Sequence, residues 1–99
     1  NTTGVRETPD TPTRYQLGQN YPNPFNPVTR INYNLPEPGK VKLLLYDVTG
    51  RTVATLADGS YTADQHTVTL DASHLTTGLY FYKLQSRNFV SVKKMMLLK

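Results

Sequence analysis

The chain has 99 residues, a formal net charge of +4 and no cysteine. This length allows one domain with a small core, and the lack of thiols excludes disulfides, thiolate metal sites and a cysteine nucleophile. No stretch is apolar over the ~18 residues that a membrane-spanning helix needs. The first residues lack a basic region followed by an apolar run, so they are not a signal peptide, and we expect the sequence to be a piece of a larger protein.

Residues 1–14 are rich in threonine and proline, contain few apolar residues and show no periodicity. Such a segment cannot bury enough apolar surface to order itself. We therefore predict a flexible linker over 1–14 and a folded domain over 15–99.

The domain begins with an unusual loop, YPNPFNP at 21–27. Its three prolines exclude a helix. Asn23 and Asn26 suit turn hydrogen bonds between side chain and backbone. Tyr21 and Phe25 are large apolar side chains in a polar loop, so we expect both to pack under the domain as a plug.

The rest of the chain alternates between apolar and polar residues, the pattern of strands with one buried face. The continuous apolar stretch within 41–46 indicates a central strand. Turns are predicted at 47–50 and 58–60, and a single helical turn capped by Asp71 is predicted at 71–75, with Leu75 closing one end of the core. The predicted strands are 30–35, 41–46, 51–57, 65–71, 79–84 and 89–98.

Six or seven short strands at this spacing are typical of an all-β fold. We predict an immunoglobulin-like antiparallel β-sandwich of about seven strands, with a small barrel as the alternative.

The sequence offers little for catalysis or cofactor binding. The acidic residues lie in the linker or at turns, and the pair His66 and His74 matches no zinc pattern. Nucleophile elbows, dinucleotide motifs and P-loops are missing. Asp47 and Asp71 could offer oxygen ligands to calcium, but no EF-hand loop supports this. We therefore expect neither enzyme activity nor a cofactor or metal site.

Tyrosine is abundant, which raises a carbohydrate-binding or surface-anchoring module as an alternative function. Such modules stack sugar rings on exposed aromatic side chains, and Tyr80 and Tyr82 are candidates. The competing interpretation, which we favour, places these tyrosines in the core with their hydroxyl groups at its rim.

The closing segment, 89–99, is a long basic strand. From Lys83 onward the chain has five basic residues and no acid. A terminal strand readily becomes a sheet edge, where another strand can add or two copies can pair as a dimer. No basic–aromatic groove pattern accompanies the charge, so nucleic acid is not an expected partner.

Five motifs in order resemble one family. They are YPNPFNP at 21–27, INY at 31–33, LYDVTGR at 45–51, LTTGLYFY at 75–82 and the final KKM at 93–95. Together they resemble the type A C-terminal sorting domain of the type IX secretion system, over about 17–99. The pattern is also similar to the immunoglobulin-like domain of flagellar hook-capping proteins.

The resemblance to sorting domains implies a function without catalysis. Such domains end secreted proteins of Gram-negative bacteria, which travel through the periplasm to the cell surface or the extracellular space. It implies an N-terminal cargo domain, recognition by an outer-membrane translocon, and a sortase-like peptidase that cuts before Tyr21. By position it assigns recognition to a small set of residues: Gly78, Tyr80, Lys93, Lys94 and Met95, to which we add Lys99 from the basic end.

Overall fold

The computed structural model describes residues 11–99, and this part of the chain contains seven strands and no helix. The prediction for 1–10 as linker lies outside the described residues. The strands are β2 (Gln16–Leu17), β3 (Val28–Asn34), β4 (Gly39–Tyr46), β5 (Thr52–Tyr61), β6 (Gln65–Asp71), β7 (Gly78–Ser86) and β8 (Phe89–Leu97).

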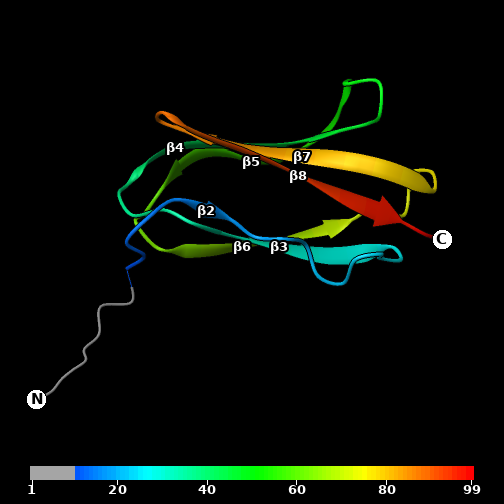
Figure 1. The fold of residues 1–99 in the computed structure, drawn as a ribbon, viewed down its shortest axis with the longest axis horizontal. Helices are drawn as coiled ribbons and strands as arrows, with labels where there is room; N and C mark the ends of the chain where they lie inside the picture. The colour runs from blue at the N-terminus through cyan, green and yellow to red at the C-terminus, as the bar shows by residue number, and fades with distance from the viewer. Residues whose placement is uncertain (1–10) are drawn as a thin grey trace, which may run out of the picture.

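The strands form two antiparallel sheets that face each other as a sandwich (Figure 1). The smaller sheet has the order β2-β3-β6 and the larger has the order β5-β4-β7-β8. The predicted all-β sandwich is therefore confirmed, and the barrel alternative is wrong because the two sheets do not join into one closed ladder. The central position predicted for the 41–46 strand is also confirmed, since β4 lies between β5 and β7.

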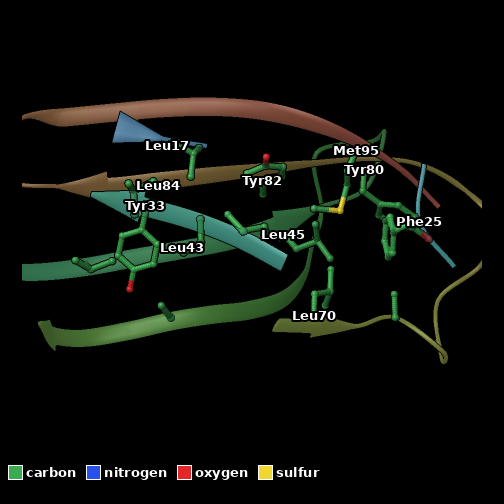
Figure 2. Packing of buried hydrophobic residues seen from close by; sticks show 14 of the residues in the cluster. Leu17, Phe25, Tyr33, Leu43, Leu45, Leu70, Tyr80, Tyr82, Leu84 and Met95 are labelled. Carbon is green, nitrogen blue, oxygen red and sulfur yellow. The ribbon is translucent and has the colours of Figure 1, made fainter. Parts of the chain in front are cut away.

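The core lies between the sheets, as the period-2 pattern predicted. In β7, for example, Tyr80, Tyr82 and Leu84 are buried and share one face. Each fully buried large apolar side chain contributes about 1.5–3 kcal/mol to stability. Figure 2 shows how side chains from both sheets meet in this layer, which contains Leu17, Phe25, Ile31, Tyr33, Leu35, Val41, Leu43, Leu45, Ala57, Leu70, Ala72, Tyr80, Tyr82, Leu84, Met95 and Leu97.

Tyr82 joins the two sheets through its hydroxyl group. The hydroxyl donates to the Gly18 carbonyl oxygen at 2.7 Å and accepts from the Asn20 amide at 2.8 Å. Both partners follow β2 of the smaller sheet. Burial raises the pKa of Tyr82 to about 12, so this hydroxyl stays protonated and able to donate at physiological pH.

The predicted turn at 58–60 is wrong, because β5 continues through these residues to Tyr61. Val41 pairs with Gly59 and Lys42 with Asp58. Cross-strand pairing with β4 thus overrides the local turn preference of an Asp-Gly-Ser sequence. The pairing of β5 with β4 is also irregular, with register shifts opposite Leu43/Leu44 and Leu45/Tyr46.

Two other turns follow their local chemistry. Gly50 adopts a φ of 87°, as expected for the glycine of the 47–50 turn. The Asp71 carboxylate accepts from the Ser73 amide at 3.0 Å, which confirms the cap. The predicted helical turn is not helical: it is one tight turn, in which the Leu75 amide donates to the Ala72 carbonyl oxygen. The few residues between β6 and β7 form too few hydrogen bonds to offset the entropy cost of nucleating a helix.

Candidate recognition surface at the C-terminal strand

β8 forms one edge of the larger sheet, so the predicted terminal edge strand is confirmed. Its inner side pairs with β7 along its whole length, from Gly78↔Leu97 to Ser86↔Phe89. Its outer side, the backbone edge that faces away from β7, has two parts. We call residues 95–98 the capped segment and residues 90–94 the open segment.

The capped segment is covered by the proline-rich loop, which we call the capping loop (residues 19–27). The Phe25 amide donates to the Met96 carbonyl oxygen at 2.9 Å, and the Leu98 amide donates to the Phe25 carbonyl oxygen at 2.9 Å. The Met96 amide donates to Asn23 Oδ1 at 3.0 Å. Through these bonds the loop pairs with β8 as a short extra strand would, and Phe25 and Leu97 form an isolated parallel bridge.

The capping loop is held in place by its own polar network. Asn20 is buried, and its side-chain amide donates to the Pro22 carbonyl oxygen at 3.0 Å and to Thr29 Oγ1 at 3.1 Å. The Thr29 hydroxyl donates to the same Pro22 oxygen at 2.8 Å. Buried polar groups must be paired in this way to avoid a desolvation cost. The loop therefore presents a defined edge to β8.

The predicted plug is half right. Phe25 is buried at 2 % exposure and lies at the same end of the core as Tyr80 and Met95 (Figure 2). Tyr21 is 78 % exposed, so its predicted burial is wrong. Its backbone bridges to Arg30, and residues directly opposite each other share a face. Because Arg30 faces solvent, Tyr21 does too.

Three of the six predicted recognition residues support the fold, two as core side chains and one through its backbone conformation. Tyr80 and Met95 are buried opposite each other on β7 and β8, and the Tyr80 hydroxyl donates to the Thr76 carbonyl oxygen at 2.7 Å. Gly78 has a φ of 157°, a conformation rarely open to other residues, while the space around it is empty. Glycine is thus required there by the backbone rather than by a close neighbour.

The other three are lysines in separate places. Lys93 and Lys94 are neighbours in a strand, so their side chains point to opposite faces of the sheet. Lys93 is half-buried on the face of Met95, whereas Lys94 is exposed on the outer face. Lys99 is tied to the turn after β6, where its ammonium donates to the Ser73 carbonyl oxygen and its amide donates to Thr77 Oγ1. The basic end is therefore not one patch.

The sheet register adds residues that the sequence did not indicate. On the outer face of the larger sheet, Lys83 lies opposite Val92, and Lys94 lies opposite Phe81. Lys83 also sits 5.5 Å from the centre of the Tyr46 ring, within reach of a cation–π contact. Apolar side chains and lysines thus alternate over this face. The pairing of β4, β7 and β8 in register brings these side chains together.

The structure brings no metal-binding group together within residues 11–99. Asp47 accepts hydrogen bonds from Thr49 and Arg51 in its own turn, and the Thr49 hydroxyl lowers its pKa. Asp71 is likewise occupied by its own turn. His66 stacks on Tyr33 with ring centres 5.2 Å apart. Each of these groups has a local structural partner. In the same described part of the chain, no helix is long and apolar enough to cross a membrane.

The fold and this surface agree with a family comparison. A model of the secretion system C-terminal sorting domain matches residues 19–98, which cover the capping loop and all strands from β3 to β8. No match was found among curated proteins or among solved structures. The chain belongs to the family of secretion system C-terminal sorting domains.

This membership gives the chain its function. It is a C-terminal sorting signal for type IX secretion, and it directs export to the cell surface or the extracellular space. Its partners are the type IX secretion machinery and the cargo attached to its N-terminal side. Domains of this family are in general non-catalytic.

Proposed function

We propose that the secretion machinery recognises the folded sandwich, and that the last residues of the chain act by completing this fold rather than as a free linear tag. One observation carries the proposal. Met95 and Leu97 are 1 % and 0 % exposed, and the capping loop bonds to the strand between them. A receptor cannot bind these residues as an extended peptide without first breaking the core.

Among the predicted recognition residues, the proposal assigns two kinds of role. Tyr80 and Met95 support the surface from within the core, Gly78 sets the backbone at the start of β7, and Lys99 binds the chain end to the turn at 73–77. Lys93 and Lys94 are left to contact an outer-membrane translocon. The support is their burial, backbone conformation and hydrogen bonds, as described above.

An export assay separates a folded signal from a linear one. The chain is fused to the C-terminus of a periplasmic reporter in a bacterium with type IX secretion. Phe25→Ala leaves residues 93–99 unchanged but removes a core side chain, at a cost of about 3–5 kcal/mol. We expect export to fall with the folded fraction. Deleting residues 93–99 would abolish export under either model and therefore does not discriminate.

Tyr21→Ala is the matched control, since it removes an exposed aromatic ring from the same loop. Its export should equal that of the unchanged chain. Full export of a Phe25→Ala fusion shown to be unfolded would overturn the proposal, because only a linear tag would survive unfolding.

We also infer that a sortase-like peptidase cuts the folded protein on the N-terminal side of Tyr15, the start that we propose for the domain. Leu17 and Asn20 are buried, and the Gly18 amide donates to the Asn32 carbonyl oxygen at 2.8 Å. A peptidase needs an extended, accessible backbone, so residues 15–20 are unsuitable. Mass spectrometry of the released cargo tests this, and an end within 16–20 would contradict it.

Neither catalysis nor sugar binding gains support. Asp47, Asp64 and Asp71 accept hydrogen bonds within their own turns, and His66 stacks on Tyr33. Tyr80 and Tyr82, the residues considered for sugar stacking, are buried in the core. We therefore propose that the chain is not an enzyme and that it acts only by being recognised.

A further inference from the structure

The open segment, residues 90–94, has unused backbone hydrogen-bonding groups. Along an antiparallel edge strand, alternate residues direct their N–H and C=O groups outward. The backbone N–H and C=O groups of Met96 point outward, to the capping loop. The same groups of Val92 and Val90, four and six residues earlier, therefore point outward as well. Within residues 11–99 no partner meets the outward groups of Val90 and Val92 or the Lys94 amide, while Gln19 Nε2 donates to the Lys94 carbonyl oxygen at 2.8 Å. The capping loop thus reaches the open segment only at the Lys94 carbonyl oxygen, and the outward groups of Val90 and Val92 and the Lys94 amide are left without a partner among the described residues.

The side chains of the open segment have a definite order. Val90 and Val92 are 54 % and 55 % exposed on the outer face. Lys93 and Lys94 follow, one on each face of the sheet. Neither lysine forms an ion pair with any residue between 11 and 99. An added strand would thus meet apolar side chains at one end of the open segment and positive charge on both faces at the other.

We propose that the open segment is a docking edge for an extended segment of a partner protein, with apolar residues beside Val90 and Val92 and two adjacent carboxylates beside Lys93 and Lys94. This rests on the proposed recognition of a folded surface and specifies its chemistry. Backbone pairing supplies affinity that does not depend on sequence, and the alternating side chains supply specificity. Two neighbouring acids are required because consecutive residues of the added strand would face opposite sides.

A second copy of this chain is a poorer occupant. Antiparallel pairing of two open segments about Val92 would place each Lys94 beside a Val90, with no acid for either lysine. It would also bring two chains of net charge +4 together. The lysines at this edge thus oppose self-pairing, as charged residues on edge strands commonly do.

The test uses the 99-residue chain and a capped peptide, Glu-Asp-Val-Thr-Val-Thr, which in antiparallel pairing sets its acids beside Lys94 and Lys93. NMR titration should shift the amide signals of residues 90–94 and leave β5 unchanged. A peptide in which both acids are replaced by lysine is the control, and equal binding of that peptide would contradict the charge assignment.

Variants locate the contact. Lys93→Glu with Lys94→Glu should weaken binding at least about fivefold, the sum of two modest surface ion pairs. Lys40→Glu is the matched control, since it changes an exposed lysine of β4 opposite Ser60, and it should bind like the unchanged chain. Val92→Pro removes an outward amide without touching the β7 ladder and should abolish binding if the NMR spectrum remains folded.

Three results would overturn the docking edge. They are amide shifts that map elsewhere, a dimer through β8 that excludes the peptide, and peptide binding that appears only after Glu7 and Asp10 are changed to lysine, which would assign the edge to the chain's own N-terminal residues. Any of these, with export still lost in Phe25→Ala, would leave the folded-signal proposal standing and remove only the docking edge.

Discussion

The capped and open segments follow one strand, and both pair with β7 as far as Leu97, but they differ in what covers their outer side. The capped segment receives backbone and side-chain hydrogen bonds from a loop that lies about seventy residues earlier in the chain. On that side, the open segment receives only one hydrogen bond from the described residues, from Gln19 Nε2 to the Lys94 carbonyl oxygen. The comparison shows that one terminal strand can complete a core and still leave a short edge for a partner. Capping one part limits the exposed edge and so its tendency to aggregate.

The two ends of the described chain also lie at different ends of the sandwich. In Figure 1 the chain enters at one end of the sandwich, near the start of β2, and the C-terminus lies at the opposite end. The described chain thus begins at the end of the sandwich opposite the capped segment. The proposed peptidase and the proposed translocon contact would then act at separate ends of one domain.

Side-chain truncations in the two segments should differ most in how much unfolding free energy they remove. Leu97→Ala should destabilise the domain by about 2–5 kcal/mol, because a buried side chain is lost and a cavity remains. Val92→Ala, in the open segment, should change the free energy of unfolding by no more than about 0.5 kcal/mol. Chemical denaturation monitored by tyrosine fluorescence measures both. Equal losses would mean that the two segments are packed alike.

A smaller effect concerns the cap itself. Asn23→Ala removes the acceptor of the Met96 amide and should cost about 0.5–1.5 kcal/mol. Hydrogen exchange at Met96 should quicken. The outward Val92 amide should exchange fast in both proteins and serves as the internal control. An unchanged Met96 rate would show that Asn23 does not hold the capped segment.

The smallest effect is one of pH. Hydrogen bonds from the Ser73 hydroxyl and amide lower the pKa of Asp71 from its usual 3.8, and the nearby charges of His74 and Lys99 act in the same direction. A lowered pKa contributes stability that is present above the unfolded value and is lost as the pH falls through the folded value. Acid should therefore weaken the turn that holds Lys99, next to the capped segment.

Thermal unfolding of the chain and of Asp71→Asn, measured from about pH 6 to about pH 2, tests this linkage. The unchanged chain should be the more stable of the two above pH 3.8, and the difference should shrink below it. Asp47 titrates in both proteins and cancels. A difference that is constant with pH would show that the Asp71 charge does not matter.

Local chemistry and periodicity determined much of the fold in advance. Apolar patterning marked every strand from β3 to β8, by a continuous apolar stretch in β4 and elsewhere mainly by alternation, since burial of one face imposes a period of two. The hydrogen-bonding role of Asp71 and the turn at Gly50 were predictable, because a side-chain cap and a positive φ depend only on residues close in sequence. The prediction of a turn at 58–60 was wrong, because pairing with β4 outweighs the local turn preference. The predicted burial of Tyr21 was wrong, because its backbone bridge to Arg30 places its side chain on the solvent face.

For the recognition surface, the residue pattern already predicted a basic terminal strand at a sheet edge, and the motifs indicated a sorting domain. Which part of that edge is available depends on how distant segments pack against it. Asn23 and Phe25 meet Met96 through backbone groups, which every residue carries, so no residue pattern announces the contact. Likewise, two lysines adjacent in sequence lie on opposite faces because the strand is pleated, and the lysine and apolar side chains of the outer face adjoin only because three strands pair in register.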